Sequence, residues 1–215
     1  MNSSNDTIFY GDHSCAIASI AALEETGQPF SAVRVPMHPE GAGESSFGDL
    51  NPRRQVPVFR TRERIIRETG AILTFLDHRH PSKSLLPADA ALRVAAAEWL
   101  GYLGGTVHPT FRLLFRPERF VGYSDAARND LRKTTVALIK RILAQLDHDL
   151  GDRTWVLGPR SALDFYLFAF SRWAPLVGVS LGDALANHHR RAKELPAMVR
   201  ALAREVAGAE VERIS

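Results

Sequence analysis

The chain has 215 residues, a formal net charge of +3 and a hydrophobic content of 45%. This length can bury a substantial core and suits one large domain or two modest ones. The small net charge gives little support for nucleic acid as a partner, and no apolar run reaches the ~20 residues of a membrane span. The single cysteine, Cys15, excludes an intrachain disulfide framework. Because the start of the chain also lacks a signal-peptide pattern, we expect a cytoplasmic protein with no nucleic acid and no membrane as partner.

The first third of the chain predicts strands that alternate with helices. In chain order, the predicted elements are a strand at residues 7–10, a helix at 15–26, a strand at 30–35, a loop at 36–43, a helical turn at 45–50, a strand from 56, a strand at 64–67 and a helix at 68–80. The first helix is expected to end at Gly27, a typical glycine stop. The β-α-β order implies a parallel strand pair with a right-handed crossover, and the later two strands predict an antiparallel hairpin.

After a linker at residues 81–87, the chain predicts helices only. Mostly apolar residues recur at steps of three or four along two stripes: Leu92, Ala96, Trp99, Leu103, Val107, Phe111 and Leu114, then Leu131, Thr135, Leu138, Ile142, Leu146 and Leu150. Pro109 lies inside the first stripe and is expected to kink that helix. Ser161–Asp164 reads as a capping box before an apolar, buried central helix that extends to Val177. Two shorter helices follow, and the predicted domains are residues 1–81 and 88–215.

The stretch from Asn51 to Phe59 offers a place where a small peptide could dock. Pro57 cannot donate a ladder hydrogen bond, so it belongs at the start or the edge of a strand. Two alternatives are open here: an ordinary edge strand with a trans proline, or a cis Val56–Pro57 bond. The cis form would leave the N–H and C=O of Val56 pointing outward, where they could pair with an extended peptide as a neighbouring strand does.

Several motifs, each weak alone, together resemble the cytosolic glutathione transferases, and specifically the bacterial beta class. They are Phe9-Tyr10 with Cys15, Asn51-Pro52 with Gln55-Val56-Pro57, Glu68-Thr69 with Ala71-Ile72, Glu98-Trp99-Leu100 with His108, Leu114-Phe115-Arg116-Pro117, the Ser161–Asp164 box, Tyr166-Leu167-Phe168 and Arg172-Trp173. They span nearly the whole chain in the right order. The resemblance implies an α+β thioredoxin-like N-terminal domain (βαβ-α-ββα), an all-α C-terminal helical domain, and a homodimer.

The resemblance also implies an activity. The first domain would bind glutathione as a substrate, and the second would hold a small apolar electrophile to which glutathione is conjugated. Peroxidase or thiol–disulfide activity is a related expectation, and an isomerase or dehalogenase that uses glutathione would share the same site. The alternative is a non-catalytic ligand-binding or regulatory protein on the same fold.

The predicted catalytic residues are Cys15, His108 and, third, Tyr10, which the resemblance places near the glutathione sulfur. Cys15 lies at a predicted helix start, a position that lowers a thiol pKa, although a buried and inert cysteine is the alternative. A γ-glutamyl carboxylate suits the helix start at Glu68 and Thr69, where free N–H groups favour an anion; a simple first-turn acid is the alternative for Glu68. The predicted glutathione-binding residues are Cys15, Val56, Pro57, Glu68, Thr69, Thr106 and His108.

The co-substrate pocket is expected to be apolar, with few polar groups. Its candidate residues are His13, Phe111, Phe115, Tyr166 and Trp173. Aromatic residues at helical spacing usually belong to the core, which is the alternative for each of them. No metal is expected, because the histidine pairs at 78 and 80 and at 188 and 189 lack carboxylate or cysteine partners at ligand spacing.

Four positions depart from the beta-class pattern. Arg53-Arg54 stand where that class usually has Lys-Gly, and Gly101 stands where it often has Asn. Arg160, and not an apolar residue, precedes the Ser161 cap. The loop at 36–43 lacks the lysine that often reaches the glycyl end of glutathione. These departures affect the expected activity more than the expected fold.

Overall fold

The structure of the protein, a computed structural model, describes residues 6–38, 41–43 and 45–207. Its main sheet has the strand order β2-β1-β5-β6. The strands are β1 (Thr7–Tyr10), β2 (Ser31–Arg34), β5 (Val58–Arg60) and β6 (Ile65–Arg67). β1 pairs parallel with β2, whereas β5 pairs antiparallel with both β1 and β6. The predicted parallel pair and the predicted hairpin are therefore confirmed.

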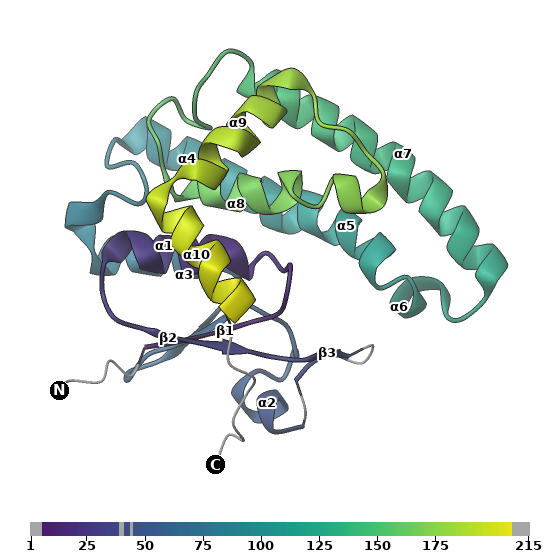
Figure 1. Cartoon of the computed structure of the whole chain (residues 1–215), viewed down its shortest axis with the longest axis horizontal. Helices are drawn as coiled ribbons and strands as arrows, with labels where there is room; N and C mark the ends of the chain where they lie inside the picture. Colours follow the sequence, from purple (N-terminus) through teal and green to yellow (C-terminus); the bar gives the residue numbers. More distant parts are fainter. Residues whose placement is uncertain (1–5, 39–40, 44, 208–215) are drawn as a thin grey trace.

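Helices cover both faces of this sheet (Figure 1). α1 (Ala16–Thr26) and α3 (Thr69–Arg79) lie between the sheet and the helical region, and α2 (Ser45–Leu50) lies on the opposite side. Because strand side chains alternate between faces, Ile8 and Tyr10 enter the large core, whereas Phe9 packs against Phe47 at 5.9 Å between ring centroids. α1 ends at Gly27, as predicted, with a positive φ of 71°.

The segment predicted as a loop at 36–43 contains regular structure. β3 (Met37–His38) and β4 (Gly41–Ala42) form a separate two-stranded antiparallel sheet, in which Met37 pairs with Ala42. Strands of two residues are too short to produce an alternating sequence pattern, so the prediction missed them. Residues 39, 40 and 44 lie outside the described part of the chain.

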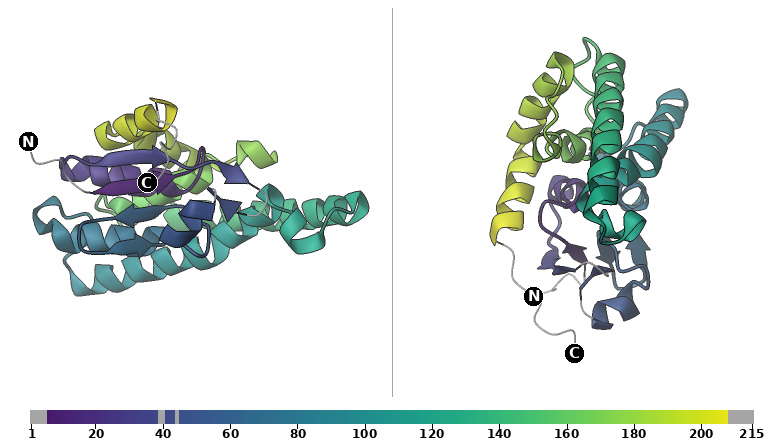
Figure 2. Two further views of the ribbon diagram at one scale, coloured as in Figure 1. Left: turned by 90° about the horizontal axis from the view of Figure 1, so that it is seen from below. Right: turned by 90° about the vertical axis from the view of Figure 1, so that its right-hand side faces the viewer.

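From residue 90 onward the regular elements of the described chain are all helical. They are α4 (Ala90–Tyr102), the π-helical segment η2 (Leu103–Val107), α5 (His108–Phe115), α6 (Glu118–Val121), α7 (Asp125–Leu150), α8 (Ala162–Ser171), the 3₁₀ turn η3 (Pro175–Val177), α9 (Asp183–Glu194) and α10 (Pro196–Ala207); another 3₁₀ turn, η1 (Pro81–Lys83), precedes them. The short helix α5 packs against the long helix α7, and both can be followed by colour in Figure 2. The short helix α6 was not predicted.

Proline accounts for two interruptions in the helical region. Pro109 has no N–H to donate one turn back, and the chain widens into η2 immediately before it. The kink expected at Pro109 stays a prediction. The predicted continuation of the central helix to Val177 was wrong. α8 ends at Ser171, four residues before Pro175, whose ring disfavours helix at the residues preceding it.

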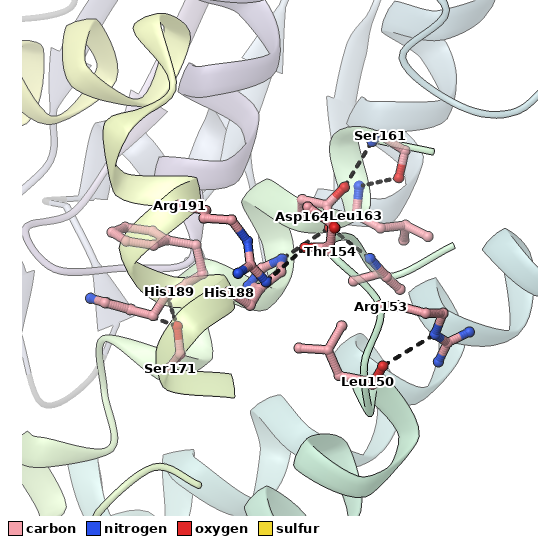
Figure 3. A network of polar contacts seen from close by, with 12 residues as sticks. Leu150, Arg153, Thr154, Ser161, Leu163, Asp164, Ser171, His188, His189 and Arg191 are labelled. Carbon is pink, nitrogen blue, oxygen red and sulfur yellow. Dashed lines mark hydrogen bonds and ion pairs between the residues drawn. The ribbon is translucent and has the colours of Figure 1, made fainter. Parts of the chain in front are cut away.

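The start of α8 is held by a buried polar network (Figure 3). The predicted capping box is confirmed: Asp164 Oδ2 accepts from the Ser161 N–H at 2.8 Å, and Ser161 Oγ accepts from the Leu163 N–H at 3.3 Å. Asp164 Oδ1 also accepts from the Val156 N–H and lies 2.9 Å from His188 Nε2. Asp164 and His188 are both fully buried, so one carboxylate ties α8 to α9 and to the loop before α8.

Ion pairs link the helical region back to the first part of the chain. Arg160, at the position where the apolar staple is missing, pairs with Glu25 of α1 at 2.7 Å. Arg200 and Arg204 of α10 both pair with Glu24 of α1, the former at 2.7 Å. Because α10 packs on α1, the division into residues 1–81 and 88–215 stays a prediction.

Candidate functional site

A cleft of about 420 Å³ opens between the loops of the thioredoxin-like part and the helical region. Ten of the predicted site residues line it: His13, Cys15, Val56, Pro57, Glu68, Thr69, His108, Phe115, Tyr166 and Trp173. The first six come from the thioredoxin-like part, and the other four come from α5, α8 and the turn after α8. The fold therefore brings together residues that are up to about three quarters of the chain apart.

Three predicted site residues do not line this cleft. Tyr10 is fully buried beneath α10, where its hydroxyl donates to the Arg204 carbonyl at 3.2 Å, and burial raises its pKa. Thr106 is exposed and lines a separate depression, because a residue two positions before His108 falls on the other side of a helix. Phe111 is fully buried and stacks on Phe115 at 6.0 Å, so it belongs to the core.

Cys15 lies at the N-cap of α1 with a side chain that is 2% exposed. The Thr69 hydroxyl donates to its sulfur at 3.6 Å. Burial raises the pKa of the Cys15 thiol to about 11, which the nearby hydroxyl of Thr69 lowers only in part. The predicted lowering of this pKa was therefore wrong: the loss of solvation outweighs the helix start, and the thiol is neutral at pH 7.

We expect alkylation of native Cys15 by iodoacetamide to be slow and to rise about tenfold per pH unit between pH 7 and pH 10. A pKa of about 11 in place of the ordinary value near ~8.5 lowers the thiolate fraction at pH 7 by two orders of magnitude or more. Mass spectrometry of the intact chain measures this rate, since Cys15 is the only cysteine. The urea-unfolded chain is the control; equal rates for native and unfolded chains at pH 8 would contradict the prediction.

His108 opens α5 and faces the cleft as a neutral ring. Its imidazole packs against Trp173 and Phe170 at 5.3 and 6.0 Å between ring centroids. Burial first, and then the positive charge of Arg112, lower the pKa of His108 to about 4. The ring can donate or accept a hydrogen bond at neutral pH, but it carries no charge there.

His13 holds the loop before α1 against the helical region. Its carbonyl accepts from the Trp173 indole N–H at 2.6 Å, and its Nδ1 accepts from Arg172 at 2.7 Å. Arg172 in turn pairs with Glu205 of α10 at 2.8 Å, in a largely buried ion pair. His13 thus lines the cleft, and its ring accepts a hydrogen bond from the guanidinium of Arg172. This contact fixes the position of the loop next to Cys15.

The stretch around Val56 offers free main-chain groups. The Val56–Pro57 bond is cis, which decides between the two alternatives that the sequence left open. Within the described part of the chain, neither the N–H nor the C=O of Val56 has a hydrogen-bond partner. Asn51 fixes the turn that precedes it, because its side-chain amide donates to the Gln55 carbonyl at 2.8 Å.

The start of α3 completes the thioredoxin-like side of the cleft. Thr69 is its first helical residue, and Glu68 precedes it with a positive φ of 71° and no capping hydrogen bond from its side chain. The exposed carboxylate of Glu68 pairs with Arg53 at 2.7 Å. Arg54, in contrast, turns back and donates to the carbonyls of Ala42 and Gly43, so it braces β4.

Several arginines that sequence reasoning did not assign to the cleft line it. They are Arg54, Arg67, Arg112, Arg116 and Arg119. A signal for two of them was present in the sequence, since Arg112 and Arg116 follow His108 at successive steps of four, the spacing of one helix face. The predicted pocket was assumed to be apolar, and that assumption kept these residues out of the prediction.

Similarity to known proteins decides the family. Over 205 residues the chain is 31% identical to Glutathione S-transferase GstA of Escherichia coli O157:H7, an alignment that covers 92% of this chain and 98% of that protein. The chain belongs to the glutathione S-transferase family. Residues 14–79 of the chain match the family described as Glutathione S-transferase, N-terminal domain.

Solved structures agree with this assignment over both parts of the transferase. A sphingomonad glutathione S-transferase complexed with glutathione is 28% identical to this chain and has a TM-score of 0.81. The match covers 93% of this chain and 98% of that chain. The bacterial beta class glutathione S-transferase of Sphingomonas chungbukensis is 29% identical, with a TM-score of 0.81 and the same coverage of 93% and 98%. The resemblance to the beta class and the thioredoxin-like fold followed by a helical region are thus confirmed.

The described residues contain neither a cluster suited to a metal ion nor a helix suited to span a membrane. No group of three or more histidine, cysteine, aspartate or glutamate side chains among them is placed to hold a metal ion. His188 and His189 have protein partners, since His188 contacts Asp164 and His189 lies 2.8 Å from the Ser171 hydroxyl. No helix within these residues is both long and apolar enough to span a bilayer.

Proposed function

We propose that this glutathione S-transferase binds glutathione in the cleft and conjugates it to small electrophiles held against the helical region. The observation that carries this proposal is one of placement. The unpaired main-chain groups of Val56, the start of α3, and the side chains of Cys15 and His108 all line the same cleft. An extended acidic tripeptide with a central cysteine needs main-chain groups to pair with, a site for its carboxylate and polar groups near its sulfur.

The tripeptide would lie along the thioredoxin-like side. Its cysteinyl main chain would pair with the N–H and C=O of Val56, as a short added strand. Its γ-glutamyl carboxylate would accept from the free N–H groups at the start of α3, beginning at Thr69. Its α-ammonium group would contact the carboxylate of Glu68.

Arg53 is the group that already contacts the Glu68 carboxylate. Both side chains of this pair are mostly exposed, at 61% and 65%. An exposed ion pair of this kind is worth about 0–1 kcal/mol, so an ammonium group bound in the cleft can replace it at small cost. The Arg53–Glu68 pair is therefore compatible with a glutathione molecule bound at Glu68.

The sulfur of glutathione would lie between Cys15 and His108. Both groups are neutral at pH 7, the first because its pKa is about 11 and the second because its pKa is about 4. Each can therefore donate a hydrogen bond to a thiolate without adding charge. The positive charge close by is that of Arg112, which lowers the pKa of both groups and would favour the thiolate of glutathione in the same way.

Retention on immobilised glutathione under reducing conditions tests the proposal. We expect the wild type to be retained and to elute with free glutathione, and Glu68→Ala to bind about tenfold or more weakly, as expected for loss of a charge-assisted hydrogen bond. Glu63→Ala is the matched control, because Glu63 is exposed and does not line the cleft. A wild type that flows through the column would favour the non-catalytic alternative.

A homodimer, which the resemblance implies, stays a prediction. Sedimentation equilibrium of the full chain would test it, and a mass equal to that of the 23.8 kDa chain would contradict it.

A further inference from the structure

The cleft carries more positive charge than one glutathione molecule can use. Among the described residues, five arginines line it, against two carboxylates, those of Asp12 and Glu68. Both carboxylates already pair with arginines that lie outside the lining: Asp12 with Arg34 at 3.0 Å, and Glu68 with Arg53 at 2.7 Å. The lining arginines are therefore not neutralised by these two acids.

Glutathione accounts for the positive charge on one side only. It carries two carboxylates and one ammonium group at neutral pH, a single net negative charge. Arg54 and Arg67 lie on the thioredoxin-like side, where they donate to the carbonyls of Gly43 and Leu50 next to the proposed tripeptide position. Arg112 and Arg116 lie on the opposite, helical side, at the end of α5.

Neither Arg112 nor Arg116 has a side-chain partner within residues 6–38, 41–43 and 45–207. No ion pair or side-chain hydrogen bond involves either guanidinium there, although both side chains are half-buried in the cleft wall. Arg112 lines the cleft together with Cys15 and His108, and its positive charge lowers the pKa of both groups. Two half-buried cations without partners, next to the reacting atom, are suited to a bound anion.

The wall around these two cations is apolar. Phe115 packs edge-to-face on Trp173 at 5.2 Å, and Pro109 and the exposed Leu176 continue the same surface. A co-substrate here would meet aromatic faces for its body and guanidinium groups for a charged end. We propose that the preferred electrophile is an aromatic or unsaturated carboxylate, whose carboxylate group binds Arg112 and Arg116 while its apolar body packs on Phe115 and Trp173.

This inference rests on the proposed function and specifies its second substrate. With a chloroaromatic acid, the glutathione sulfur forms a bond to the ring carbon, and the carbon–chlorine bond breaks. Chloride leaves with the bonding electron pair, and the thiol proton passes to water. No oxidant or further reactant is needed, and the carboxylate remains unchanged on the product.

A matched pair of electrophiles tests the inference: 4-chloro-3,5-dinitrobenzoate and its uncharged methyl ester. Each enzymatic kcat/KM is divided by the rate constant of the same electrophile with free glutathione, which removes the difference in intrinsic reactivity. We expect the wild type to favour the carboxylate by about tenfold or more, as charge-assisted hydrogen bonds to a carboxylate do. Arg116→Gln is expected to lose most of this preference while it keeps turnover of the ester. Arg112→Gln should also lose the preference, but it should lower both rates, because the charge of Arg112 favours the glutathione thiolate.

Two further variants serve as controls for the effect of charge. Arg112→Lys retains the charge and should retain part of the preference. Arg190→Gln removes an equal charge from α9, where Arg190 is exposed and donates to Asn187 at 2.6 Å, and should change neither rate. Thermal unfolding of each variant verifies that it is folded.

The two possible failures are distinguishable. If the wild type turns over the ester at least as well as the carboxylate, or if Arg116→Gln lowers both rates equally, the inference is wrong and the transferase proposal stands. If the wild type accelerates neither reaction, the proposed function is wrong and the inference falls with it.

Discussion

Replacing Asp164 by alanine is expected to lower the free energy of unfolding by about 3–5 kcal/mol, the cost of breaking a buried polar pair. The carboxylate is fully buried and accepts from the Ser161 and Val156 N–H groups while it contacts His188. Its removal would leave all three groups without this partner in the protein interior, and α8 would lose one of the two hydrogen bonds of its capping box. Because α8 is the central buried helix, the lost hydrogen bonds should destabilise the whole helical region.

Urea denaturation followed by circular dichroism measures this effect. Asp164→Asn, which keeps one acceptor oxygen, should cost less, and Asp152→Ala, at an exposed position in the same loop, should stay within about 0.5 kcal/mol of the wild type. A double-mutant cycle with His188→Ala would isolate the contribution of the histidine contact. A change below about 1 kcal/mol for Asp164→Ala would show that the network does not stabilise the fold in this way.

Replacing Phe170 by alanine is expected to cost about 3–5 kcal/mol and to loosen the cleft. The ring is fully buried and is the meeting point of four others. Its centroid lies within 5.0–6.3 Å of those of Tyr166, Trp173, His108 and Phe111. Three of these four rings line the cleft, so a cavity behind them would release the groups that position the substrates.

Denaturation and glutathione affinity, measured on the same variant, separate the two consequences. Phe170→Leu fills part of the space and should retain more of the stability and the affinity than Phe170→Ala. Phe120→Ala is the matched control, because Phe120 is 50% exposed and its loss should change stability by no more than about 0.5 kcal/mol. Equal effects of the two alanine variants would contradict the assigned role of Phe170.

Elements with a strong local signal were predicted well. The glycine at 27 and the Ser161–Asp164 box each act within a few residues, so the helix end and the helix start that they mark could be predicted from the sequence. The two-residue strands β3 and β4 and the four-residue helix α6 were missed because their local signals are weak. The end of α8 was misjudged although Pro175 marks it in the sequence.

The structure places most of the motif residues at the cleft, and side-chain direction takes two of the predicted residues away from it. Cys15, Glu68, Thr69 and His108 line the cleft, whereas strand alternation turns Tyr10 toward α10 and helix phase turns Thr106 outward. These side-chain directions depend on how each strand or helix is placed and rotated relative to the cleft, and the motifs carry no information about this placement.

The sequence by itself determined the order and type of the main elements, the single cysteine and the family resemblance. Only the tertiary structure decided the state of the site. The pKa of Cys15 is raised by burial among residues from three separate segments, and the pKa of His108 is lowered by burial in the same core. Likewise, the excess of arginines in the cleft arises from two segments about fifty residues apart. Desolvation and Coulomb interactions depend on distances in space, and the fold sets those distances between residues that are remote in the chain.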